Sequence, residues 1–153
     1  MLEDFEENAE EELKRADHLI YVTLKYTKTV DVIRNTIHRL INSMDFVVME
    51  VLTYLRVKNM SDVPRMRMEQ LIEKIPKLKE YADFYFMLRR IYNSKFDCKE
   101  EYRKNVTLLT EEGDVNIETL KEFFTKAKRF VRSLQDFCKG KEMTFEKDIF
   151  KDD

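Results

Sequence analysis

The 153-residue chain is poor in glycine and proline, with two of each, and has no tryptophan, two cysteines and two histidines. Phosphate-binding loops, dinucleotide fingerprints and nucleophile elbows need glycines at fixed spacing, and Gly113 and Gly140 match none of these motifs. Scarce turn-forming residues favour long helices over a many-stranded sheet. No apolar run approaches the ~20 residues that span a bilayer. We therefore expect a helical protein with no membrane-spanning segment and no bound cofactor.

Cysteine and histidine are also too few and too scattered for a metal centre. Cys98 and Cys138 lie far apart, without CxxC spacing or a neighbouring histidine, and neither histidine has the glutamate three residues earlier that a di-iron bundle needs. We expect two buried or partly buried thiols in a reducing environment. The acidic N-terminus lacks the basic and apolar segments of a signal peptide, which favours a cytoplasmic location.

Charge is abundant but unevenly distributed. Charged residues make up 38% of the chain, a Lys- and Glu-rich composition of the kind found in thermophile proteins. Residues 1–12 hold seven acids and no base, whereas residues 13–40 hold six bases and two acids, and residues 56–104 hold thirteen bases and eight acids. A basic middle between acidic ends is compatible with an anionic partner. Solvated helix faces with an acidic N-terminus are the alternative interpretation.

Apolar residues recur at helical spacing in two long stretches, Leu2–Tyr26 and Val30–Val57. Only Thr27–Thr29 separates them, and so short a link keeps consecutive helices antiparallel. The second stretch is apolar over much of its circumference, so we expect it at the centre of the fold. Thr29 or Asp31 is its expected N-cap. A long antiparallel hairpin is therefore the predicted organising element.

The remaining chain predicts three more helices and one irregular segment. Between the last two helices, Val106–Leu109 and Val115–Ile117 are short apolar runs around a turn at Gly113, which predicts a small β-hairpin, with a loop and 3₁₀ turn as the alternative. The predicted fold is all-α, a helical bundle of about five helices in one domain. That domain spans residues 1–140, and a charged C-terminal tail, residues 141–153, docks as a final turn or frays.

Arg34, His38 and Arg39 are the first candidates for a functional role. Arg34 and His38 are four residues apart on the second helix and share one face, and Arg39 is adjacent. A histidine beside an arginine can act as a general acid or base on a phosphodiester while the arginine stabilises developing charge. The alternative is a polar face on which Asp31 or Asp45 pairs with these cations.

Two further segments combine bases with aromatic residues or with one another. Tyr21, Lys25, Tyr26 and Lys28 interleave rings and positive charges near the tip of the hairpin, a pattern in which nucleic-acid bases stack on rings while lysines neutralise phosphates. Half-buried packing tyrosines are the alternative. A second basic cluster precedes the last helix and contains Arg89, Arg90, Lys95, Lys99, Arg103 and Lys104.

The order of elements resembles the HEPN superfamily. The resemblance rests on a long helical hairpin, further helices, and the segment Glu101–Val106 before a terminal helix. Domains of that family are small, all-helical and often dimeric, and many are metal-independent RNases or partners of nucleotidyltransferases in toxin–antitoxin and defence systems. In the family motif, an arginine and a polar residue precede a histidine by four to six residues. Arg103 and Lys104 match its start, but Leu108, Leu109 and Thr110 fill the histidine window, so the resemblance implies a degenerate, non-catalytic relative.

Two functional hypotheses follow from the sequence. The first is a small intracellular protein that acts by association, as a homodimer or with a protein partner, motivated by the broad apolar stripe of the second helix and by 8 Met and 11 Phe. The second is a HEPN-like RNA-binding protein or RNase. Its predicted nucleic-acid-binding residues are Arg34, His38, Arg39, Arg103 and Lys104. Enzymatic activity is left open, with a non-catalytic role favoured.

Overall fold

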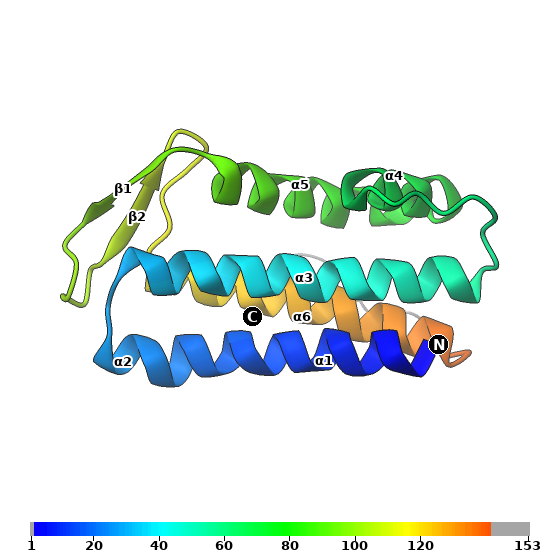
Figure 1. The fold of residues 1–153 in the computed structure, drawn as a ribbon, viewed down its shortest axis with the longest axis horizontal. Helices are drawn as coiled ribbons and strands as arrows, with labels where there is room; N and C mark the ends of the chain where they lie inside the picture. The colour runs from blue at the N-terminus through cyan, green and yellow to red at the C-terminus, as the bar shows by residue number, and fades with distance from the viewer. Residues whose placement is uncertain (1, 142–153) are drawn as a thin grey trace.

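The computed structural model describes residues 2–141 and is mostly helical, with a small two-stranded antiparallel sheet. Its elements are α1 (Leu2–His18), the π-helical turn η1 (Leu19–Thr23), α2 (Leu24–Tyr26), α3 (Val30–Tyr54), α4 (Pro64–Lys74), the 3₁₀ turn η2 (Pro76–Leu78), α5 (Lys79–Asn93), β1 (Phe96–Lys99), β2 (Thr107–Thr110) and α6 (Ile117–Cys138). Figure 1 shows α1, α3, α5 and α6 extending along one common direction, with the sheet at one end. The predicted predominance of helix is confirmed.

The antiparallel pair of helices forms where the two long apolar stretches predict it. α1, η1 and α2 run continuously to Tyr26, and α3 begins at Val30 and returns along α1 (Figure 1). Thr29 caps α3, because its Oγ1 accepts a hydrogen bond of 3.4 Å from the Val32 N–H. The sequence pattern predicts no π-helical turn, yet the Leu24 N–H donates to the Leu19 carbonyl five residues earlier.

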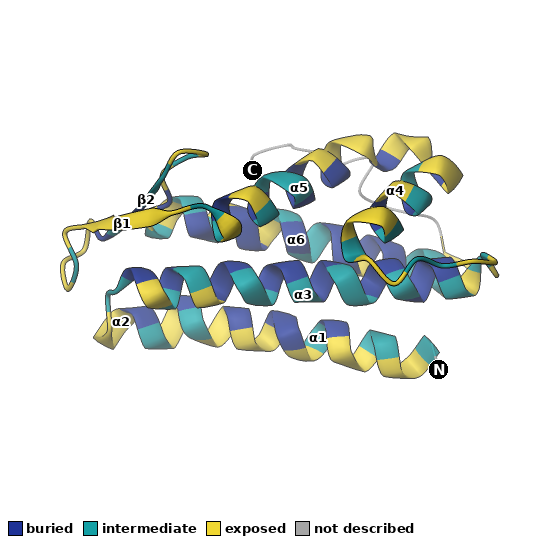
Figure 2. Cartoon of the chain, turned by 45° about the horizontal axis from the view of Figure 1, so that its top comes forward, coloured by how far each residue is buried: buried dark blue, intermediate teal, exposed yellow. Residues whose placement is uncertain are grey.

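α3 is the central helix, as its broad apolar stripe predicts. It packs against α1, α4, α5 and α6, and Figure 2 shows buried positions on it along most of its length. Aromatic rings from α5 and α6 pack together in the core beside α3. The ring centres of Tyr81 and Phe130 lie 5.4 Å apart, and those of Phe84 and Phe123 lie 5.8 Å apart. The apolar surface of α3 is therefore covered by helices of the same chain.

A β-hairpin precedes α6, but its strands differ from those expected. β1 pairs antiparallel with β2, with Phe96 opposite Thr110 and Lys99 opposite Thr107. The expected pairing of Val106–Leu109 with Val115–Ile117 is wrong except for one isolated bridge between Leu108 and Val115. All four residues of β1 are exposed, so the strand has no apolar alternation by which the sequence could reveal it. Gly113 has the expected positive φ, at 149°.

α6 begins and ends at the residues that its sequence indicates. The Asn116 side chain caps its N-terminus by accepting a 2.8 Å hydrogen bond from the Thr119 N–H. Beyond Cys138, Gly140 has a φ of 78°, a left-handed conformation that glycine adopts without strain. The predicted charged tail, residues 141–153, lies outside the described residues from 142 onward. The division between domain and tail stays a prediction.

Candidate functional site

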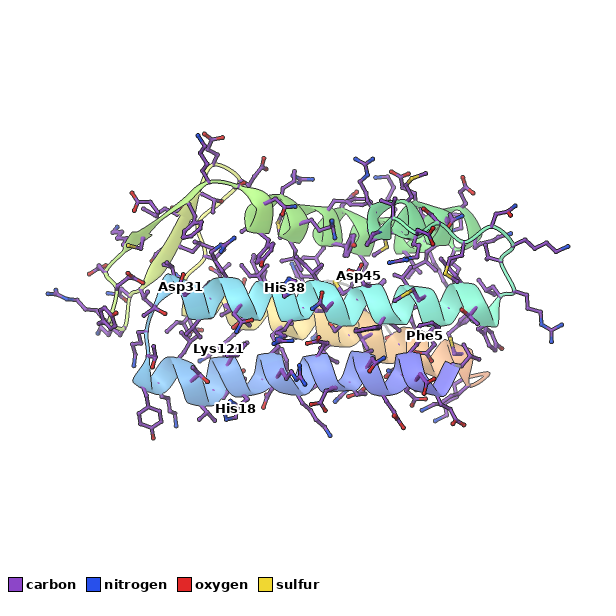
Figure 3. All side chains as sticks on the ribbon, viewed as in Figure 1. Phe5, His18, Asp31, His38, Asp45 and Lys121 are labelled. Carbon is purple, nitrogen blue, oxygen red and sulfur yellow. The ribbon has the colours of Figure 1, made fainter. Side chains whose placement is uncertain are left out.

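Arg34 and His38 come together, as their spacing predicts, around a single ring at the end of α5. The Arg34 guanidinium lies 4.7 Å from the Tyr92 ring centre and 4.2 Å from that of Phe96, and its Nη2 donates to the Tyr92 carbonyl at 2.9 Å. The His38 ring stacks on Tyr92 at 5.1 Å. Figure 3 shows His38 and Asp45 at different positions along the edge of α3 that faces α5. Both side chains therefore pack between elements of the fold, Arg34 against α5 and β1 and His38 against α5.

Arg39 takes part in a different contact, with α1. Its Nη1 lies 3.1 Å from Oε2 of Glu12, and the Asn42 amide donates to Oε1 of the same carboxylate at 3.4 Å. The Glu12 residue is only 9% exposed, and these two partners satisfy its buried carboxylate oxygens. Arg39 thus lies apart from the surroundings of Tyr92.

Arg103 and Lys104 lie exposed in the loop between β1 and β2, and this loop docks on the link between α2 and α3. The Tyr102 N–H donates to the Lys28 carbonyl at 2.7 Å, and Oε2 of Glu101 accepts from the Val30 N–H at 2.9 Å. These bonds join segments more than 70 residues apart in sequence. The second bond also places a carboxylate at the N-terminus of α3, where the helix dipole favours it.

Docking of this loop brings two exposed tyrosines to the same end of the molecule. Tyr26 is 84% exposed and Tyr102 is 76% exposed. Four bases accompany them, and we call the six residues the aromatic tip: Lys25, Tyr26, Lys28, Tyr102, Arg103 and Lys104. Tyr102 has a φ of 67° and Glu100 a φ of 54°, left-handed conformations that are unfavourable for residues other than glycine. The fold therefore holds Tyr102 outward in a strained loop.

The electrostatic surroundings of the aromatic tip are mixed. Lys28 Nζ donates to the Lys25 carbonyl at 2.7 Å, which ties this side chain back to α2. Negative charges nearby come from Glu100 and from Glu101, the latter engaged by the Val30 N–H. In the sequence, the bases around Tyr26 and those around Arg103 form two separate segments. Only the long-range hydrogen bonds bring them together.

A partly buried hydrogen-bond network links Asp45 on α3 with Tyr85 and Arg89 on α5, and the sequence pattern does not predict it. The Tyr85 hydroxyl donates to Oδ1 of Asp45, and Nη1 of Arg89 donates to the same hydroxyl at 3.3 Å. Burial raises the pKa of Asp45 above its usual range, and the hydrogen bond from Tyr85 opposes that rise. Burial, followed by the charge of Asp45, raises the pKa of Tyr85. This network ties α3 to α5 and leaves Tyr85 as a donor throughout the physiological pH range.

Thiols and metal ligands define no further centre within residues 2–141. Cys138 is half-buried, but Cys98 is exposed, so the expectation of two buried or partly buried thiols is wrong for Cys98. It lies on β1, where all four residues face solvent. No group of three or more His, Cys, Asp or Glu side chains in this part of the chain could hold a metal ion. Likewise, none of its helices combines the length and apolar character that crossing a bilayer requires.

No family model, no curated protein and no solved structure matches the chain.

Proposed function

We propose that this helical bundle is a non-catalytic, cytoplasmic RNA-binding protein that holds single-stranded RNA on its aromatic tip. The observation that carries the proposal is the meeting of Tyr26 and Tyr102, both largely exposed, with four bases at one end of the molecule. Exposed rings provide stacking platforms for bases of any sequence, and neighbouring Lys and Arg neutralise the backbone. The HEPN-like layout is compatible with this role, and that resemblance stays a proposal.

Cleavage is less well supported than binding. A metal-independent RNase needs a base and a cation that both reach the scissile phosphate. His38 is stacked on Tyr92, and Arg34 is held between two rings and a backbone carbonyl. Arg103 is in a separate loop. The proposal therefore keeps Arg103 and Lys104 as RNA contacts at the tip and gives Arg34 and His38 roles in packing. Arg39 lies outside the tip, where it pairs with Glu12.

Association as a homodimer or with a protein partner stays a prediction. Its main motivation was the broad apolar stripe of α3, which is buried against helices of the same chain. Light scattering at micromolar concentration tests the dimer directly. A dimer would also double the number of aromatic tips available to one RNA strand.

Fluorescence anisotropy of a short labelled single-stranded RNA at low salt tests the proposed function. We expect Tyr26→Ala and Tyr102→Ala each to weaken binding about 5- to 150-fold, because stacking on one ring contributes roughly 1–3 kcal/mol per base. Tyr26→Phe and Tyr102→Phe keep the ring and should bind nearly as well as the wild type. Arg103→Gln should lower the salt dependence by about 0.7 in the log–log slope.

A matched control removes an exposed ring elsewhere. Tyr54 is 39% exposed, near the end of α3 opposite the tip, and Tyr54→Ala should leave the RNA affinity unchanged. RNA binding that is absent at low salt, or that survives both alanine substitutions at the tip, contradicts the proposed function.

A further inference from the structure

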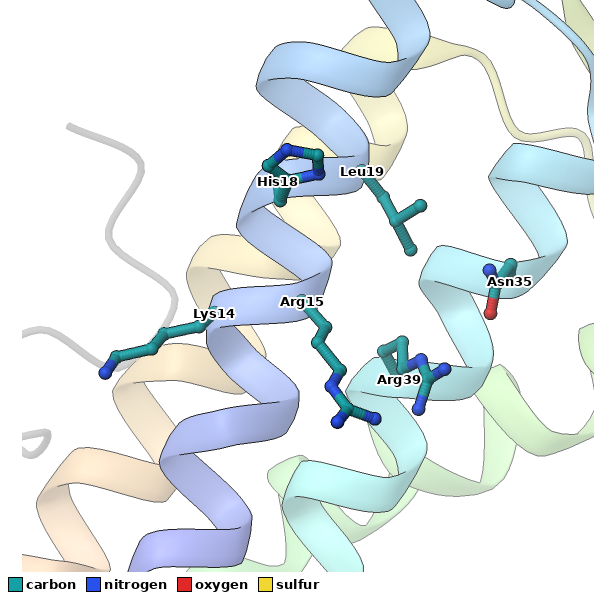
Figure 4. A pocket seen from close by; sticks show the side chains of 6 residues that line it. All are labelled: Lys14, Arg15, His18, Leu19, Asn35 and Arg39. Carbon is teal, nitrogen blue, oxygen red and sulfur yellow. The ribbon is translucent and has the colours of Figure 1, made fainter.

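A basic pocket lies between α1 and α3, away from the aromatic tip. It has a volume of about 280 Å³ and is lined by Lys14, Arg15, His18, Leu19, Asn35 and Arg39. Figure 4 shows Arg15 and Arg39 in the groove between the two helices and Leu19 pointing across it toward Asn35. The Lys14 side chain extends away from α3 in the same view. Two guanidinium groups from different helices thus share one concave surface with an amide.

The carboxylates facing this pocket leave both arginines able to donate further hydrogen bonds. Arg15 pairs with Glu11 through Nε at 3.4 Å, but both side chains are more than half exposed, and such surface pairs are weak. Within residues 2–141, Arg39 donates hydrogen bonds only to Glu12, and it does so only through Nη1. Its Nε and Nη2 are then available to a ligand. Glu12 in turn holds the Arg39 side chain in a fixed position beside the groove.

The π-helical turn begins at the edge of this pocket. Leu19 is both its first residue and part of the pocket lining, and the turn continues to Thr23. Oγ1 of Thr23 lies 3.5 Å from Nδ1 of His18, which connects the turn to the pocket rim. Single π-helical turns within α-helices occur frequently at functional sites because the extra residue redirects side chains. Here the turn coincides with the arginine-lined groove.

We propose that the pocket between α1 and α3 binds one phosphate group, with Arg15, Arg39 and Asn35 as donors. Arginine is well suited to this ligand because its planar N–H groups match phosphate oxygens. The volume is near the lower end of the range for ligand pockets, roughly 300–1,000 Å³, which fits a single phosphate better than a whole dinucleotide. The phosphate comes from a small phosphomonoester or from an RNA backbone. This site does not depend on the aromatic tip.

Titration of the isotope-labelled full chain with inorganic phosphate and with adenosine monophosphate, followed by NMR, tests the site. We expect saturable shifts of the Leu19 and Asn35 backbone amides, and affinity about tenfold lower in Arg15→Gln. Asn35→Asp places a negative charge on the exposed rim and should abolish the shifts. Loss of Arg15, unlike loss of Arg39, does not leave the Glu12 carboxylate buried without its cation.

The matched control is Lys79→Gln. Lys79 forms an exposed pair with Asp83 four residues later at 3.1 Å, like the Arg15–Glu11 pair, but on α5. The Lys79→Gln substitution should leave phosphate binding unchanged.

Two outcomes distinguish the sources of the phosphate group. Tighter binding of adenosine monophosphate than of inorganic phosphate indicates a small phosphomonoester. A salt slope of RNA binding that is lower by about 0.7 in Arg15→Gln indicates an RNA backbone.

Three results overturn the phosphate site: no saturable shift with either probe, shifts confined to other regions, or equal weakening in Lys79→Gln and Arg15→Gln. Failure of this site is separable from failure of the proposed RNA surface. Tyr26→Ala and Tyr102→Ala should leave binding of inorganic phosphate unchanged, whatever they do to RNA binding.

Discussion

Glu50 makes the stability of this protein depend on pH near neutrality. The residue is on α3 and is only 2% exposed. It accepts a hydrogen bond from the Cys138 thiol, whereas its Oε1 has no hydrogen-bond partner within residues 2–141. Burial, and then the nearby charge of Glu6, raise the pKa of Glu50 from 4.5 to about 7. The charge of Lys139, which is paired with Glu6 at 2.8 Å, opposes this rise.

The sign of the effect follows from which state binds the proton more tightly. The folded state holds the Glu50 proton up to a pKa of about 7, whereas the unfolded chain releases it near 4.5. Stability from this group is therefore fully present below the unfolded pKa and is lost as pH rises through the folded pKa. A shift of this size corresponds to about 3 kcal/mol between the two limits, at about 1.4 kcal/mol per pKa unit. This is a large part of the roughly 5–15 kcal/mol that stabilises a typical domain.

Chemical denaturation of the wild type and of Glu50→Gln between pH 4 and pH 9 measures the effect. Glutamine has nearly the same shape and no charge, so we expect the wild type to lose about 3 kcal/mol relative to this variant as pH rises, while other titrating groups cancel in the difference. Glu73→Gln, on the exposed face of α4, is the control and should follow the wild type at every pH. A stability difference between wild type and Glu50→Gln that stays constant over this range would refute the reasoning.

Two further substitutions test contacts that join distant parts of the chain. Tyr85→Phe should lower the free energy of unfolding by about 1–3 kcal/mol, because Asp45 then lacks its donor in a largely buried position, and denaturation at neutral pH measures the loss. Glu101→Ala should lower the free energy of unfolding by about 1 kcal/mol, because it removes the acceptor at the N-terminus of α3. We also expect faster hydrogen exchange of the Tyr102 amide, because the docked loop loosens. Unchanged exchange would contradict the anchoring role of Glu101.

The helices could be predicted because their signals are local. Apolar spacing, the short link at Thr27–Thr29 and the side-chain caps at Thr29 and Asn116 each depend on residues a few positions apart. The π-helical turn leaves no such signal, since the apolar stripe passes through it to Leu24 at ordinary helical intervals. β1 was missed for a different reason. Its four residues are all exposed, so pairing with β2 rather than apolar burial defines the strand.

The aromatic tip could not be predicted from local sequence patterns. The basic and aromatic character of both contributing segments was visible in the sequence, but their proximity depends on how the β1–β2 loop meets the α2–α3 link. Two hydrogen bonds determine that meeting, and in both the donor is a backbone N–H, which every residue except proline carries. No residue pattern can therefore predict it. Whether two short basic segments form one surface depends on the tertiary structure.

The separation of Arg39 from Arg34 and His38, by contrast, could have been foreseen from helix geometry. Successive residues of an α-helix point about 100° apart, so Arg39 faces a different side from His38, whereas residues four apart share a face. The structure follows this geometry, with Arg34 and His38 toward α5 and Arg39 toward α1. Asn35 precedes Arg39 by four residues and accordingly lines the same pocket. Helical periodicity thus divides one predicted cluster into a packing face and a candidate phosphate-binding face.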